Sequence, residues 1–189
     1  RYKMKKTIFS ILSTLLIIFL LGCSKSTSVT TGATPTVSTI QFNGNNFANN
    51  GVYPKLYTCD SLGISPALKW SNAPAATLSY AITMHHIPPT GDKHVYLVLY
   101  NIPSTTTSIP ENSKTIGVFG INTVDGKTSY TPPCSQGPGA KIYVLTVYAL
   151  SGAPVISVPS AQVTMDILLA GMKGKILDST SMSVTYTRP

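Results

Sequence analysis

Four apolar runs rich in Val, Ile, Leu and Tyr constrain the fold of this chain most strongly. They are residues 78–84 (LSYAITM), 94–102 (HVYLVLYNI), 142–150 (IYVLTVYAL) and 182–187 (MSVTYT). Side chains of this kind are typical of strands, and the near-continuous apolarity of the second and third runs indicates central strands covered on both faces. Prolines punctuate the segments between the runs, as is typical of loops. The pattern predicts one all-β or β-dominated domain.

Residues 160–177 (SAQVTMDILLAGMKGKIL) form the one segment with a clear helical pattern. Ser160 is the expected N-cap. One face would carry Val163, Ile167, Leu168 and Met172 at helical spacing. We interpret this stripe as core packing, which places a single helix near the C-terminus of the domain.

The first segment reads as an export signal. From Met4 the chain runs MKKTIFSILSTLLIIFLLGC, with two lysines, an apolar stretch and a Leu-x-Gly-Cys ending that resembles a bacterial lipobox. We therefore predict a lipoprotein signal peptide over residues 1–22 and a lipidated Cys23. An ordinary signal peptide with a coincidental cysteine is the alternative. The expected location is the bacterial cell envelope, with the protein anchored to the membrane on its extracytoplasmic side.

Residues 24–37 (SKSTSVTTGATPTV) contain mostly Ser, Thr, Gly and Pro. Such a segment buries too little apolar surface to order itself, so we expect residues 23–38 to be a flexible tether. The remaining residues, 39–189, are enough for one domain with its own core.

Net charge argues against nucleic acid as a partner. The formal charge of +8 includes four basic residues of the expected signal, and without them 10 basic and 6 acidic residues leave +4. Outside this signal the chain has no basic run, which is atypical of a nucleic-acid-binding surface.

With Cys23 used by lipid, Cys59 and Cys134 are the two thiols left. In an oxidising compartment such a pair more often forms a disulfide than a metal or redox site. We predict this bridge; a free, reactive thiol is the alternative.

Four motifs in order resemble the phosphatidylethanolamine-binding proteins, and specifically their bacterial Raf-kinase-inhibitor-like branch. Residues 57–74 (YTCDSLGISPALKWSNAP) resemble the family signature Y-T-C-D-G-x-x-x-S-P-x-L-x-W-x-x-A-P. Residues 98–103 (VLYNIP), 137–150 (GPGAKIYVLTVYAL) and 168–177 (LLAGMKGKIL) resemble two later strands and the C-terminal helix. The resemblance implies two antiparallel sheets with a C-terminal helix, and a small cavity at one end that binds phosphate-like head groups.

The chain departs from the family at the polar positions of that cavity. His85-His86 stand where the family has the carboxylates of an Asp-Pro-Asp-x-Pro loop, and Lys141 replaces the histidine of its His-Arg-Tyr motif. The resemblance then implies a remodelled pocket, richer in hydrogen-bond donors. Its expected ligand-binding residues are His85, His86, Tyr96, Pro132, Pro133, Lys141 and Tyr143.

All three histidines of the chain lie within ten residues, and neighbouring strand residues point to opposite faces. If the strand continues through the pair, either His85 or His86 faces the cavity. If Pro88 and Pro89 end the strand before this pair, both histidines can face the cavity. His94 is expected at the rim.

The predicted function is a lipid-anchored binding protein for a small anion, a phospholipid head group or another small molecule, without a cofactor. One alternative is an inhibitor or interaction protein that regulates a protease or another envelope enzyme. A second is a metal-binding protein that uses His85, His86 and His94 with Tyr96. Catalysis is not expected, because the acids are scattered and a nucleophilic Cys134 beside a histidine would compete with the disulfide.

Overall fold

The structure is a computed structural model that describes residues 40–134, 136 and 138–189. The predicted signal peptide and tether lie outside these residues. Among them, no helix has the length and apolarity needed to cross a bilayer.

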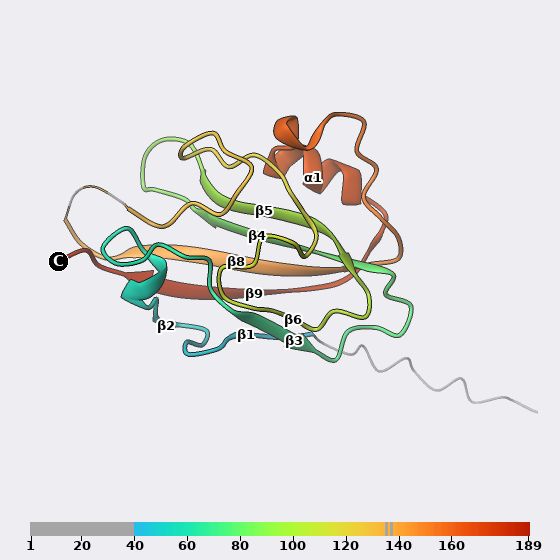
Figure 1. Ribbon diagram of the computed structural model, residues 1–189, viewed down its shortest axis with the longest axis horizontal. Helices are drawn as coiled ribbons and strands as arrows, with labels where there is room; N and C mark the ends of the chain where they lie inside the picture. The colour runs from blue at the N-terminus through green and yellow to red at the C-terminus, as the bar shows by residue number, and fades with distance from the viewer. Residues whose placement is uncertain (1–39, 135, 137) are drawn as a thin grey trace, which may run out of the picture. The chain divides into compact units, whose positions relative to one another are not determined.

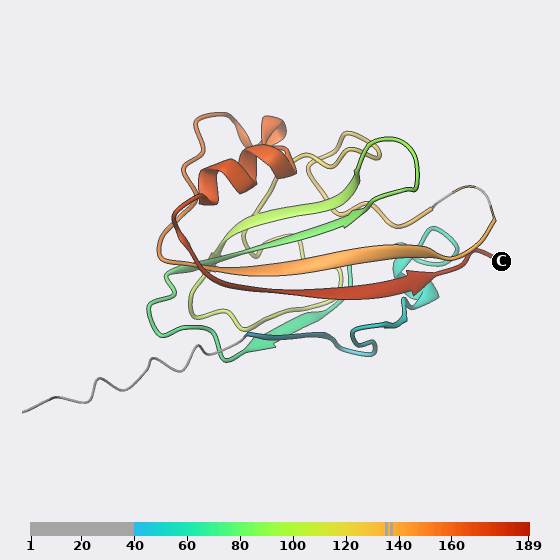
Figure 2. The same cartoon turned by 180° about the vertical axis from the view of Figure 1, so that it is seen from behind.

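A six-stranded sheet forms the centre of the domain (Figures 1 and 2). Neighbouring strands are antiparallel except β2 and β9, which are parallel. In sheet order the strands are β2 (Gly51–Val52), β9 (Ile176–Tyr186), β8 (Lys141–Leu150), β4 (Ser79–His86), β5 (His94–Pro103) and β7 (Val118–Phe119). The four predicted apolar runs are therefore the four long strands, and the two with near-continuous apolarity, β5 and β8, both have neighbours on each side.

A smaller antiparallel sheet and a helix cover the two faces of the large sheet (Figures 1 and 2). The small sheet has the order β1 (Gln41–Gly44), β3 (Leu68–Ser71) and β6 (Ser108–Ile109). The helix is α1 (Met165–Met172), and two short 3-10 turns are η1 (Lys55–Tyr57) and η2 (Ser160–Gln162). This is the predicted β-dominated architecture of two sheets with one helix near the C-terminus.

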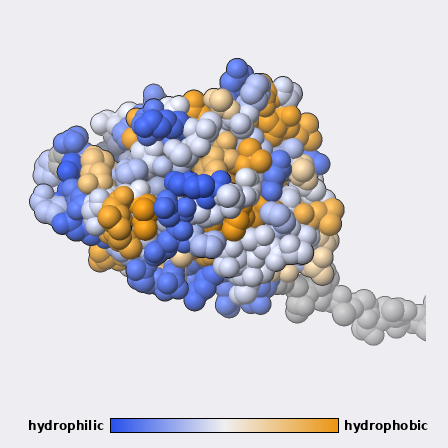
Figure 3. All heavy atoms as spheres, in the orientation of Figure 1, coloured by the Kyte–Doolittle hydropathy of each residue, from blue (hydrophilic) through white to orange (hydrophobic). Residues whose placement is uncertain are grey.

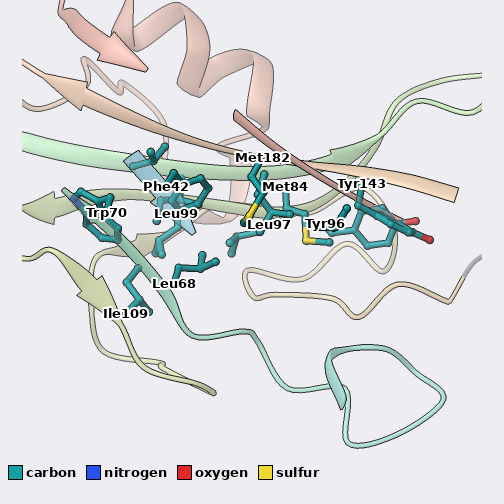
Figure 4. Close-up of a cluster of buried hydrophobic side chains, with 14 of the residues drawn as sticks. Phe42, Leu68, Trp70, Met84, Tyr96, Leu97, Leu99, Ile109, Tyr143 and Met182 are labelled. Carbon is teal, nitrogen blue, oxygen red and sulfur yellow. The ribbon is translucent and has the colours of Figure 1, made fainter. Parts of the chain in front are cut away.

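The main core lies between the two sheets, and strand alternation determines which residues enter it. Figure 4 shows a row of its buried side chains, from Trp70 and Leu99 through Leu97 and Met84 to Tyr96 and Tyr143. A second buried cluster lies on the other face of the large sheet and includes Val98, Leu168 and Met172.

The helix is shorter than the predicted 160–177, because a better cap lies inside that range. The Thr164 hydroxyl accepts a 3.2 Å bond from the Ile167 amide and begins α1, whereas Ser160 begins the turn η2. Gly174, at φ 75°, then turns the chain away from the helix and into β9. Of the predicted apolar stripe, Val163, Leu168 and Met172 are buried, but Ile167 is 36% exposed.

Candidate ligand pocket

A cavity of about 390 Å³ lies at the end of the large sheet where β4 ends and β5 and β8 begin. Its polar lining comes from residues at strand ends and in the loops that follow them. The lining residues are His86, Pro88, Pro89, His94, Tyr96, Val124, Cys134, Gln136 and Lys141.

Two histidines form a cross-strand pair on the cavity wall. His86, the last residue of β4, pairs in register with His94, the first residue of β5, and their ring centroids are 6.3 Å apart. His86 Nδ1 lies 2.7 Å from the Ile142 carbonyl oxygen. A carbonyl only accepts, so Nδ1 carries a proton and Nε2 is the ring nitrogen that remains for a ligand.

His85 lies on the opposite face of the sheet. Strand β4 continues through both histidines, so Pro88 and Pro89 come too late to turn His85 inward, and His85 is not among the residues that line the cavity. Burial, with smaller contributions from Lys93 and His86, lowers the pKa of His85 below its ordinary 6.5. Within the described part of the chain, its Nδ1 is buried without a hydrogen-bond partner.

Lys141 brings an ammonium group to the cavity from the first position of β8. Its Nζ donates a 3.0 Å hydrogen bond to the Pro138 carbonyl oxygen. An ammonium has three donors, so this bond leaves two for a ligand.

Two tyrosines lie at the base of the cavity, one in its lining and one beneath it. Tyr96 is part of the lining, and its ring centroid is 5.2 Å from that of Tyr143. Tyr143 is fully buried beneath the cavity, 5.5 Å from the His86 ring, and does not line it directly. Burial raises the pKa of Tyr96, so its hydroxyl stays protonated and can donate to a ligand.

Pro132 and Pro133, expected as ligand-binding residues, also lie outside the lining. They precede Cys134, which forms a disulfide with Cys59. The Cys59 amide donates a 3.1 Å hydrogen bond to the Pro133 carbonyl oxygen. The two prolines thus belong to the segment that holds the wall in place, while Cys134 and Gln136 reach the cavity itself.

Sequence reasoning missed five lining residues: Pro88, Pro89, Val124, Cys134 and Gln136. The two prolines directly follow the histidine pair and could have been included on that ground. Val124 and Gln136 are in loops far along the chain, and nothing in their local sequence indicates the cavity.

The lining favours an anion over a cation. It contains two imidazoles, an ammonium and a phenol, and none of its described residues is acidic. Throughout the described residues, no group of three or more His, Cys, Asp or Glu side chains could hold a metal. The suggested metal set is therefore not assembled, because His85 faces away from His86 and His94.

The sequence and the fold both match known proteins. A family model described as phosphatidylethanolamine-binding protein matches residues 43–187. A UPF0098 protein of Chlamydia muridarum is 31% identical over 153 residues, which is 78% of this chain and 98% of that protein. A UPF0098 protein of Aquifex aeolicus is 32% identical over 148 residues, covering 75% and 85% of the two chains.

Two crystal structures have the same fold. A phosphatidylethanolamine-binding protein homologue of Chlamydia trachomatis superposes with a TM-score of 0.73 and 26% identity, covering 80% of this chain and 99% of its own. Escherichia coli YbcL superposes with a TM-score of 0.70 over 79% of this chain and 99% of its own; at 23% identity this likeness concerns the fold alone. None of these four names states a catalytic activity.

Proposed function

Because the chain belongs to the phosphatidylethanolamine-binding protein family, we propose that it is a lipid-anchored extracytoplasmic binding protein for a small phosphate-type anion. The observation that carries this proposal is a cavity lined by His86, His94 and Lys141 without a described acidic residue. Its volume, about 390 Å³, lies within the roughly 300–1,000 Å³ usual for ligand pockets.

The charge of the lining selects the phosphate part of a ligand. Phosphate oxygens accept charge-assisted hydrogen bonds from an ammonium and from protonated imidazoles. A phosphoethanolamine head group also carries an ammonium, which finds no described carboxylate in the lining. A phosphate ester without a cation therefore fits this cavity better than the zwitterionic head group in the family's name.

Calorimetry with inorganic phosphate, glycerol phosphate and phosphoethanolamine tests the pocket and separates these sources of phosphate. Because an ion-paired hydrogen bond contributes about 1.5–3 kcal/mol, we expect Lys141→Ala to weaken phosphate binding about 10- to 100-fold. Lys114→Ala, which removes an exposed lysine outside the cavity, is the control. Equal affinities for both variants would refute the assignment of Lys141.

The neighbouring histidines offer a matched pair of variants. His86 lines the cavity and its chain neighbour His85 does not, so variants at these two positions differ in whether they remove an imidazole that faces the ligand. His86→Gln should weaken phosphate binding because it removes an imidazole nitrogen from the cavity wall, whereas His85→Gln, on the opposite face of the sheet, should leave the affinity unchanged.

The anchor needs its own test. Cys23→Ser should release or mislocalise the protein in cell fractionation and abolish labelling by a fatty acid, because acylation would supply its membrane affinity. Unchanged fractionation and labelling would remove the lipid anchor from the proposal and leave the pocket untouched.

A second candidate function is an inhibitor that contacts an envelope enzyme through its loops. The supporting observation is Ile87, 62% exposed beside the cavity-lining Pro88 and Pro89. This function predicts that the chain captures a partner protein. Ile87→Asp should abolish this capture, and Lys141→Ala should leave it unchanged.

A further inference from the structure

The described chain begins at the end of the sheet opposite the cavity. The Ile40 amide donates a 2.9 Å bond to Asp178 Oδ2, and the Thr180 hydroxyl donates a 2.7 Å bond to the Ile40 carbonyl oxygen. Asp178 pairs with Ala149 near the end of β8, whereas Lys141 begins that strand. At about 3.3 Å per residue, the ten-residue strand separates Lys141 from the entry point by roughly 30 Å.

Apolar side chains are exposed at this same end. Leu78 is 64% exposed, Val155 70%, Ile176 43% and Leu177 39%. In Figure 1 the connection from α1 to β9 lies at the right-hand end, and in Figure 3 hydrophobic atoms reach the surface there. These four residues, with Lys173 and Lys175, are called the anchor-end patch below.

Backbone contacts connect the members of the anchor-end patch. The Leu78 amide donates to the Leu150 carbonyl oxygen at 2.8 Å, and Leu150 pairs in register with Ile176. The Val155 amide donates to the carbonyl oxygen of Gly171, near the end of α1, at 2.9 Å. The patch therefore joins the strand ends of β4, β8 and β9 to the end of the helix.

A β-bulge places two apolar residues of β9 in the patch. Asp178 pairs with Ala149 and Ile176 pairs with Leu150, so Leu177 is an extra residue on β9. Bulges redirect side chains, and here both Ile176 and Leu177 are exposed.

The charges of the patch complement an anionic surface. Lys173 and Lys175 flank Gly174 in the turn before β9. The nearby acid, Asp178, already accepts hydrogen bonds from the amides of Ile40 and Ser179. Exposed apolar side chains beside lysines are the composition of a surface that rests at a bilayer interface.

We propose that the anchor-end patch docks on an anionic bilayer and directs the cavity away from the membrane. This inference rests on the proposed acylation of Cys23. The sixteen residues 24–39 can span at most about 55 Å, so an acylated chain keeps the patch near its own bilayer. With the cavity roughly 30 Å farther out, its ligands come from solution or from an opposing surface.

The test compares two tryptophan variants of the acylated protein, one at each end of the large sheet. Each variant is bound to vesicles of phosphatidylglycerol and phosphatidylcholine with brominated acyl chains. We expect bromine to quench Leu177→Trp emission several-fold more than that of Ile142→Trp, whose position at the cavity end is 57% exposed in the unsubstituted chain. The native Trp70 is buried and contributes the same background to both variants. Equal or stronger quenching of Ile142→Trp would overturn the proposal.

Charge variants in the Leu177→Trp background make the test specific. Each lysine near an anionic surface contributes about fivefold, so Lys173→Ala/Lys175→Ala should lower the ratio of docked to undocked protein about 30-fold. Lys93→Ala/Lys114→Ala removes the same charge elsewhere and should change the ratio less than threefold. Equal losses in the two double variants, or a dimer in sedimentation that Leu177→Asp dissociates, would refute docking on lipid. Fatty-acid labelling reads acylation separately, so failure of the anchor and failure of the docking surface are distinguishable.

Discussion

A Cys59→Ala/Cys134→Ala variant removes the covalent link between the segment after η1 and the cavity wall before β8. Cys134 lines the cavity, and Gln136 follows in the same loop. The substitution therefore acts on the stability of the domain and on the geometry of the ligand pocket together.

The size of the effect follows from the loop that the disulfide closes. For a sequence separation of 75 residues, the chain-entropy relation gives about 4.5 kcal/mol of stabilisation. Domains of this kind have total free energies of unfolding of about 5–15 kcal/mol. Neighbouring contacts remain in the variant, including the bidentate contact of Arg188 with Asp60 and the Cys59–Pro133 backbone bond. We therefore expect the variant to fold with a loss of about 2–4.5 kcal/mol.

Urea unfolding of the acylated chain, with and without a reductant, measures this loss. Reduction of the unsubstituted chain should reproduce the variant's free energy of unfolding, and calorimetry should show weaker phosphate binding in both cases. The reasoning is refuted if the variant loses less than about 1 kcal/mol, or if both thiols react with an alkylating reagent in the native, unreduced protein.

Two further substitutions test the packing and the electrostatics of the large sheet. Leu168→Ala, at a fully buried position on the inner face of α1, should lower the free energy of unfolding by about 2–5 kcal/mol, whereas Ile167→Ala, at a 36% exposed position of the same helix, should lower it far less. Equal losses in urea unfolding would contradict the observed helix face. His85→Gln should flatten the pH dependence of stability, because burial lowers the pKa of His85. The unfolded chain then binds more protons below about pH 6.5, so the free energy of unfolding of the unsubstituted chain falls as pH drops from there towards the lowered pKa. Parallel curves for both proteins between pH 7.5 and 5.5 would exclude this role.

The long strands could be predicted from the sequence because their side chains carry the signal locally. Each of the four apolar runs became a strand. The boundaries of β4, β5 and β8 shifted by a few residues at most, whereas β9 begins well before its predicted run. The beginning of β9 was missed because Ile176 and Leu177 follow a helical pattern, and the turn at Gly174 overrides that pattern. Likewise, Ser160 and Thr164 both resemble caps, but Ser160 begins η2, and it is the Thr164 side chain that accepts a hydrogen bond from the first turn of α1.

The candidate site was harder to predict because it depends on register and on loop contacts. Alternation places His85 and His86 on opposite faces of the sheet only if β4 continues through both residues. No local signal in the sequence marks where β4 ends. The resemblance suggested Pro132 and Pro133 as lining residues, yet the disulfide brings Cys134 and Gln136 to the cavity instead. Long-range contacts of this kind leave no trace in the neighbouring sequence.

The positions of the two histidines and the lysine that line the cavity have a consequence for how such proteins diversify. His86 ends β4, while His94 and Lys141 begin β5 and β8, so each is the outermost residue of its strand. One register step further in, buried residues such as Met84 and Tyr143 carry the packing between the sheets. Exchange of the exposed His94 or the half-buried Lys141 would alter the charge presented to a ligand and disturb few core contacts, whereas His86 is buried and bonded to the Ile142 carbonyl oxygen. The scaffold can thus acquire new ligand preferences through mutations that cost little stability, which makes the pocket easier to evolve than the fold that supports it.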